Sequence, residues 1–130
     1  MTEPLVLDAS AVLAYLQDET GSEKVHAALL EGKAIMSAVN YAEVVGKLLE
    51  AGLPESSVKT VMGNMELHIE PLDEKQAWTI GLLRISTREF GLSLADRACL
   101  ALAYIKKIPV VTADKQWDKL KADVEIIQLR

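Results

Sequence analysis

Disulfides, long apolar segments and basic leader sequences are all missing from this chain. Its 130 residues include one cysteine, Cys99, so no disulfide framework can form within it, and a lone buried thiol suits a reducing compartment. No apolar run approaches the roughly 18 residues that span a bilayer. The first residues carry Glu3 and Asp8 but no basic residue, unlike a signal peptide. We therefore expect a cytoplasmic protein with no membrane contact.

Aromatic residues and positive charge are also scarce. Aromatics make up 5% of the chain, whereas 50% of the residues are hydrophobic and 25% are charged. This composition predicts a single folded domain, residues 1–130, with a core built mainly from Leu, Val, Ile and Ala. The net charge of −5 argues against a broad basic surface for phosphate backbones. It stays compatible with a nucleic-acid substrate if carboxylates bind cations, because bound cations reverse the local field.

Short apolar runs alternate with helical segments along the chain. Strands are predicted at 5–7, 34–36, 67–70, 110–111 and 125–129, the last at a sheet edge. Helices are predicted at 11–16, 22–31, 38–50, 55–65, 74–90, 94–107 and 115–121. In the helix at 38–50 the expected inward stripe is Val39, Ala42, Val45 or Gly46, and Leu49. The alternation predicts an α/β fold with a mainly parallel sheet covered by helices on both faces.

Four acidic residues stand at corresponding places in this pattern. Asp8 directly follows the first strand, and Glu43 lies in the first two turns of the helix after the second strand. Asp96 lies in the first turn of the helix before the fourth strand, and Asp114 follows that strand. Because the carboxyl ends of parallel strands share one edge of the sheet, we expect these four side chains to meet in one cleft.

A cluster of this kind needs compensation for its charge. Two unit charges about 4 Å apart repel by roughly 4 kcal/mol at an effective dielectric constant near 20. Carboxylates and water suit Mg²⁺ or Mn²⁺ rather than zinc, and the chain has no Cys/His spacing typical of a zinc site. Divalent ions held by carboxylates commonly catalyse phosphodiester hydrolysis.

Each acid also has an ordinary structural interpretation. Asp8 and Asp114 could each cap the helix that follows, and Asp96 could form a capping box with Ser93. Glu43 alone would be a solvated helix residue. Capping and metal binding are compatible, and the four acids taken as a set favour the metal site.

Four segments together resemble a PIN domain: VLDASAVLAYL, SAVNYAEV, LSLADRACLALA and PVVTAD. Within that superfamily the chain most resembles the VapC-type ribonuclease toxins of bacterial toxin–antitoxin pairs. The resemblance covers nearly the whole chain in the family's order. It implies an α/β/α sandwich that is a metal-dependent endoribonuclease acting on RNA. The family's acidic positions fall on Asp8, Glu43, Asp96 and Asp114, and its supporting hydroxyl positions fall on Ser10 and Thr112.

The resemblance further implies roles and partners. Asp8 and Asp96 would hold Mg²⁺, with Mn²⁺ as the alternative, directly or through water. Glu43 and Asp114 would hold a second ion or orient the attacking water, and Asp118 is a candidate fifth acid. Such proteins usually form homodimers and are inhibited by an antitoxin whose tail enters the cleft. We expect that partner to dock on the apolar faces of helices 22–31 and 38–66.

Cations and aromatic residues near the motifs are candidates for RNA contact. Trp117 and Tyr15 could stack on bases, although core packing or a dimer surface explains them equally well. Arg97 and Lys115 are candidates for phosphate contact, with Lys47 and Arg88 also close in sequence, although a solvated cation or a local ion pair explains each one taken separately better.

Three functions other than ribonuclease are alternatives for this chain. A haloacid-dehalogenase-like phosphotransferase needs an Asp two residues after Asp8, where this chain has Ser10. A receiver domain carries its acceptor Asp at the end of strand three, where this chain has Glu70 and Pro71. A PIN-like RNA-processing or non-catalytic binding module stays open, although the complete set of acids argues against a silent protein.

Overall fold

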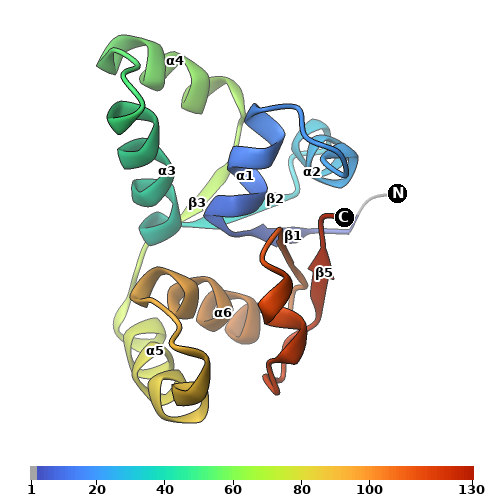
Figure 1. Cartoon of the computed structure of the whole chain (residues 1–130), viewed down its shortest axis with the longest axis vertical. Coiled ribbons are helices and arrows are strands. Elements are labelled where there is room, and N and C mark those ends of the chain that lie inside the picture. Colours follow the sequence, from blue (N-terminus) through green and yellow to red (C-terminus); the bar gives the residue numbers. More distant parts are fainter. Residues whose placement is uncertain (1–2) are drawn as a thin grey trace.

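A five-stranded sheet organises the computed structural model, which describes residues 3–130 (Figure 1). Its strand order is β3-β2-β1-β4-β5, and all four neighbouring pairs are parallel. The predicted last strand lies at one edge of the sheet, as expected. The strands are β1 (Leu5–Leu7), β2 (Ala34–Ser37), β3 (His68–Glu70), β4 (Val110–Thr112) and β5 (Ile126–Gln128).

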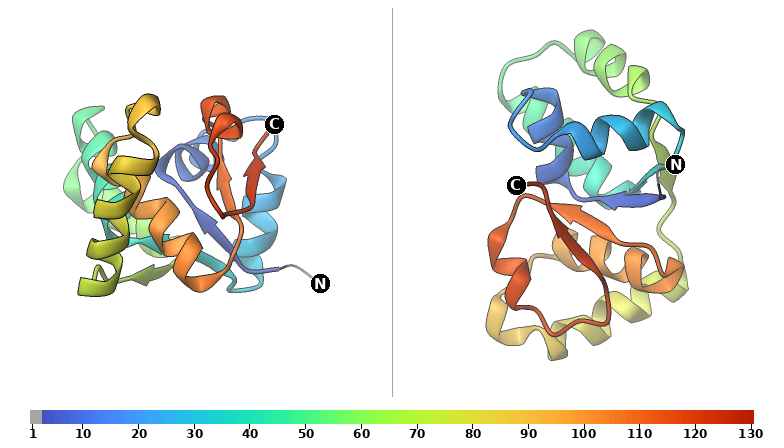
Figure 2. Two further views of the ribbon diagram at one scale, coloured as in Figure 1. Left: turned by 90° about the horizontal axis from the view of Figure 1, so that it is seen from below. Right: turned by 90° about the vertical axis from the view of Figure 1, so that its right-hand side faces the viewer.

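Helices cover both faces of this sheet. Helices α1 to α4 lie on one side, and α5 and α6 lie on the other (Figures 1 and 2). The predicted α/β architecture with a mainly parallel sheet is therefore confirmed. The helices are α1 (Ala9–Leu16), α2 (Glu23–Leu30), α3 (Ala38–Glu50), α4 (Glu55–Asn64), α5 (Glu74–Ser86) and α6 (Leu94–Lys106), with 3-10 helices η1 (Arg88–Phe90) and η2 (Lys115–Lys119).

Alternate side chains of the central strand enter different halves of the core. Leu5 and Leu7 pack with residues of α1 to α4, whereas Val6 between them packs with residues of α6. All three are buried because helices cover both faces, which explains why the strand reads as a continuous apolar run.

Helix α6 is the most enclosed helix of the described part of the chain. Its residues 97–103 are all buried, because it packs against α5, α3 and the sheet. The Asn40 side chain donates a hydrogen bond to the Ala95 carbonyl at 3.0 Å, which ties the start of α3 to the start of α6. These two helix starts carry Glu43 and Asp96, so this contact positions the candidate site.

Three local predictions were wrong. The predicted helix at 74–90 ends at Ser86, because Thr87 leaves the helical conformation with φ of −115°, and η1 follows it. The backbone N–H and the hydroxyl of Thr87 both donate to the Leu83 carbonyl, at 2.9 Å and 2.5 Å, and so cap this end. The predicted helix at 115–121 is a shorter 3-10 helix. In α3 the fully buried residues are Asn40 and Val44. Of the predicted stripe, Val39 and Val45 are half-buried and pack against the core, whereas Ala42, Gly46 and Leu49 are exposed.

None of the helices within residues 3–130 is long and apolar enough to cross a membrane.

Candidate active site

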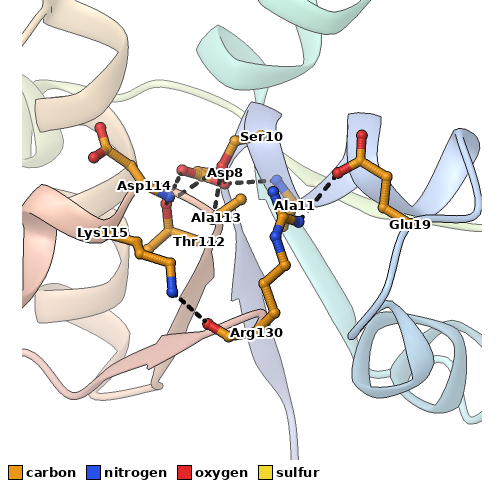
Figure 3. A network of polar contacts seen from close by, with 9 residues as sticks. All are labelled: Asp8, Ser10, Ala11, Glu19, Thr112, Ala113, Asp114, Lys115 and Arg130. Atoms are coloured by element: carbon orange, nitrogen blue, oxygen red, sulfur yellow. Dashed lines mark hydrogen bonds and ion pairs between the residues drawn. The ribbon is translucent and has the colours of Figure 1, made fainter.

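Asp8 is the centre of a buried polar network at the carboxyl end of β1 (Figure 3). Only 5% of its surface is exposed. Its Oδ1 accepts hydrogen bonds from the Ser10 hydroxyl at 2.7 Å and from the Ala11 backbone N–H at 2.9 Å. Its Oδ2 accepts from the Thr112 hydroxyl at 2.6 Å. Asp8 therefore caps α1, as its sequence position allowed, and is held at both carboxylate oxygens.

The two hydroxyls are themselves held by the end of β4. The Ser10 Oγ accepts from the Ala113 N–H at 2.9 Å, and the Thr112 Oγ1 accepts from the Asp114 N–H at 3.0 Å. A hydroxyl that accepts from a backbone N–H has its own proton available for another partner. Here both protons point to Asp8. The two predicted supporting residues thus fix the orientation of this carboxylate across two strands.

Asp8 carries a negative charge that no neighbouring cation balances. Burial raises the pKa of Asp8, and the charge of Asp96 raises it further, against the lowering effect of the bonds from Thr112, Ser10 and Ala11. Within residues 3–130 no Lys, Arg or His forms an ion pair with it. A bound cation would supply the missing counter-charge.

The charges of three of the four predicted acids act on the buried Cys99 thiol. Burial raises the pKa of Cys99 well above its usual range, and the charges of Asp8, Asp96 and Glu43 raise it further. Cys99 is fully buried in the first half of α6. The electrostatic effect relates the three acids to this part of α6, and their meeting in one cleft stays a prediction.

Asp96 combines a capping box with a free carboxylate oxygen. Its Oδ2 accepts from the Ser93 backbone N–H at 3.0 Å, and the Ser93 hydroxyl accepts from the Asp96 N–H at 3.1 Å. In the described part of the chain its Oδ1 has no hydrogen-bond partner. Asp96 therefore caps α6 and still offers one oxygen to a ligand.

Glu43 has no hydrogen bond or ion pair within residues 3–130, and it is half-buried. Asn40, one turn earlier on the same helix, ties α3 to the start of α6 and was not among the residues predicted from the sequence. The sequence feature that could have identified it is a polar residue on the inward side of α3, where Val44 is also buried.

Asp114 behaves differently from the other three acids. It is exposed, and its Oδ1 accepts from the Gln116 N–H at 2.9 Å, so it caps η2. Its charge is not among those that raise the pKa of Cys99. Its backbone N–H joins the Asp8 network through Thr112. The candidate fifth acid, Asp118, accepts a hydrogen bond from the Gln128 side chain at 3.2 Å.

The donor set fits a hydrated magnesium ion better than a fully protein-ligated one. Among residues 3–130, no three acidic, histidine or cysteine side chains lie close enough together to hold an ion between them in this arrangement. Mg²⁺ keeps several waters and usually takes only one or two carboxylates from a protein. Asp8, with its uncompensated charge, and Asp96, with its free oxygen, meet that lower requirement.

The predicted RNA-contacting cations are placed very differently. Arg97 is buried, and its Nη1 donates to the Ile80 carbonyl of α5 at 3.0 Å. Lys115 is exposed and its Nζ donates to the Arg130 carbonyl at 3.2 Å. Lys47 and Arg88 are both exposed.

The two candidate stacking residues are engaged elsewhere. Trp117 is buried in the core beside α6, which supports the packing interpretation. The Tyr15 ring stacks on the His26 ring, with centroids 5.9 Å apart.

Residues 5–123 match the family model described as PIN domain. The chain belongs to the PIN domain family. The predicted family is thereby confirmed. No curated protein sequence matches this PIN domain significantly.

Solved structures share the fold of this PIN domain along almost its whole length. The DNA-bound VapBC complex from Salmonella typhimurium has a TM-score of 0.77 and 16% identity, covering 100% of each chain. FitAcB from Neisseria gonorrhoeae has a TM-score of 0.71 and 22% identity, covering 96% of this chain and 97% of that one. The sarcin-ricin-loop-cleaving toxin VapC20 from Mycobacterium tuberculosis has a TM-score of 0.68 and 12% identity, covering 91% and 95%.

Proposed function

We propose that this PIN domain is a divalent-metal-dependent endoribonuclease and the toxin of a toxin–antitoxin pair. The observation that carries the proposal is the buried Asp8 carboxylate, which is oriented by two hydroxyls and lacks a protein cation. The charges of Asp96 and Glu43 act with that of Asp8 on the same buried thiol, Cys99. The structural similarity to VapC20, a toxin that cleaves the sarcin-ricin loop, supports the choice of RNA as substrate.

Asp8 and Asp96 would hold Mg²⁺, or Mn²⁺, partly through water, with Glu43 and Asp114 as the remaining acids of the site. When bound, the ion stabilises negative charge on the phosphate and lowers the pKa of the attacking water.

The protein's own groups would orient the reaction. Ser10 and Thr112 prevent rotation of the Asp8 carboxylate, because each donates to a different oxygen. Glu43 forms no hydrogen bond or ion pair among residues 3–130, so its carboxylate is suited to take a proton from the water that attacks phosphorus. As the new P–O bond forms, the P–O bond to the leaving nucleotide breaks, and that oxygen takes a proton from solvent.

The test is cleavage of single-stranded RNA by purified protein with Mg²⁺ and with excess EDTA. Asp8→Asn should abolish cleavage and keep the fold. Asn preserves the Oδ1 acceptor, and its Nδ2 can donate to Thr112 Oγ1, which has a second lone pair. Asp18→Asn is the matched control, because Asp18 is exposed at the far end of α1 with φ of 53°, a conformation that Asn tolerates. Equal cleavage in EDTA, or full activity of Asp8→Asn, would refute the proposal.

The toxin part of the proposal concerns a protein partner. The solved relatives include a toxin–antitoxin complex from Klebsiella pneumoniae, with a TM-score of 0.71 and 17% identity over 97% of this chain and 98% of that one. Here Leu30 at the end of α2 is 74% exposed, and Leu49 on α3 is 42% exposed. We place the antitoxin on these helices, and we expect a cytoplasmic homodimer.

A short reading frame upstream, encoding a DNA-binding antitoxin, should accompany the gene. Its product should co-purify with this chain and block RNA cleavage. The double variant Leu30→Glu, Leu49→Glu should lose the partner, whereas Leu72→Glu, an exposed leucine before α5, should keep it. A gene without such a neighbour would favour an RNA-processing role instead.

A further inference from the structure

A small basic hollow lies where α5 ends and α6 begins. Its volume is about 220 Å³, enough for roughly seven waters at about 30 Å³ each. It contains every arginine of the chain except Arg130. The residues that line it are Arg84, Thr87, Arg88, Gly91, Leu92 and Arg97.

Arg97 forms the buried part of this hollow. Only 8% of its surface is exposed, and its Nη1 is fixed by the Ile80 carbonyl. Its Nε is buried and has no hydrogen-bond partner among residues 3–130. A buried charged donor without an acceptor is costly, and such groups are rare in folded proteins. An ordered water or a ligand oxygen in the hollow would supply the missing acceptor.

The charge of the hollow is not balanced by the protein. Within residues 3–130 neither Arg84, Arg88 nor Arg97 forms an ion pair, although the chain has 19 acidic residues. Arg84 and Arg88 are exposed at its mouth. Guanidinium groups match the two oxygens of a phosphate in a bidentate arrangement, so this set is suited to a phosphate rather than to a neutral ligand.

The hollow adjoins the candidate active site through the first turn of α6. Asp96 and Arg97 are consecutive, and Gly91 and Leu92 lead into the same turn. Helices α5 and α6 lie side by side, with the end of α5 beside the start of α6 (Figure 2). The positive end of the α6 dipole adds to the charge of the arginines at this end.

We propose that this arginine hollow binds one phosphodiester group of the RNA strand, separate from the phosphate that is cleaved at the acids. The inference rests on the proposed ribonuclease function. It gives a protein of net charge −5 one local cationic contact for a polyanion, and that contact lies next to the acids that would act on the strand.

The test measures RNA binding without cleavage. Protein carrying Asp8→Asn is titrated into fluorescently labelled single-stranded RNA, and anisotropy is followed at several salt concentrations. The pocket variant adds Arg84→Gln and Arg88→Gln, both exposed, so the fold is retained. The matched control adds Lys75→Gln and Lys107→Gln, which remove two exposed charges from the opposite ends of the same helices.

The pocket variant should bind RNA about tenfold or more weakly, because two charge-assisted contacts are lost. Its slope of log K against log salt should fall by roughly 0.7 for each phosphate contact removed. The control should change little. Equal losses in both variants, or no loss in either, would overturn the inference, as would absence of RNA binding.

A second measurement separates this inference from the proposed function. Inorganic phosphate titrated into the protein should shift the Arg97 Nε–H signal in ¹⁵N NMR spectra, whether or not RNA is cleaved. An equal shift with acetate would overturn a phosphate-specific site. In active protein the pocket variant should raise KM and leave kcat unchanged if the hollow only binds the strand.

Discussion

Asp8 and Glu70 both end a strand of the same sheet, yet their surroundings have opposite effects on them. Burial raises the pKa of Asp8, which no cation accompanies. The Lys106 ammonium, 3.1 Å from Glu70, lowers the pKa of that carboxyl, and His68 adds to the effect. Glu70 lies on the edge strand β3 and has its counter-charge within the chain, whereas Asp8 directly follows the central strand β1 and has hydroxyls instead. The difference indicates which acid is built to receive an external cation.

The largest expected effect is on RNA cleavage, which should depend on the acids of the candidate site and not on Glu70. Asp96→Asn and Glu43→Gln should each lower RNA cleavage by about 100- to 1000-fold, because each removes charge from the site. Glu70→Gln removes the same charge at the sheet edge and should leave cleavage within about twofold. Initial rates with Mg²⁺ measure this, and an equal loss for Glu70→Gln would contradict the distinction.

The variant Asp114→Asn tests, in the same cleavage assay, whether Asp114 only caps η2 or also takes part in the reaction. Asn caps a 3-10 or α-helix start about as well as Asp, so Asp114→Asn keeps the bond to Gln116 while removing the charge. A loss comparable to that of Asp96→Asn would place Asp114 with the catalytic acids despite its exposure.

The next effect concerns the hydroxyl that holds Asp8. Thr112→Val removes the donor to Asp8 Oδ2 and the acceptor for the Asp114 N–H. We expect a loss of about 10- to 100-fold in Mg²⁺ affinity or activity, with a stability cost of about 1–3 kcal/mol. Thr60→Val, on the exposed face of α4, is the control. Unchanged Mg²⁺ dependence in Thr112→Val would show that Asp8 needs no orientation.

A smaller effect should appear in thermal stability without metal. The folded state disfavours the ionised form of Asp8, so Asp8→Asn should raise Tm by a few °C at neutral pH in EDTA, where about 1 kcal/mol shifts Tm by about 3–6 °C. Asp96→Asn should act in the same direction. Added Mg²⁺ should stabilise the wild type more than either variant. A lower Tm for Asp8→Asn in EDTA would contradict an uncompensated charge.

The smallest effect is the pH dependence at Glu70. Its folded-state pKa is lowered, so the stabilisation is present above its unfolded value, 4.5, and is lost as pH falls through the folded value. Because the pair with Lys106 lies near the surface, we expect at most about 1 kcal/mol. Denaturant titrations of wild type and Glu70→Gln at neutral and acidic pH should converge at low pH. A constant difference would rule out the ion pair as its source.

Much of the fold and part of the candidate site follow from local patterns. The buried strands, the caps at Asp8 and Asp96 and the family motifs were all readable, because burial and capping act over a few residues. The end of α5 at Ser86 was missed because no Gly or Pro marks it, and Thr87 caps it with both its N–H and its hydroxyl. The buried face of α3 was only partly predicted, because its fully buried residue Asn40 is polar.

The sequence by itself determined the order of elements, the mainly parallel sheet and the acids at its carboxyl edge, since hydrophobic period and strand direction set these. Only the tertiary structure decided which charges are left without a partner. Within residues 3–130, Asp8 and Arg97 form no ion pair, because elements distant in sequence bring a hydroxyl to Asp8 and a carbonyl to Arg97 instead of an opposite charge. Glu70 is compensated because α6 brings Lys106 within reach.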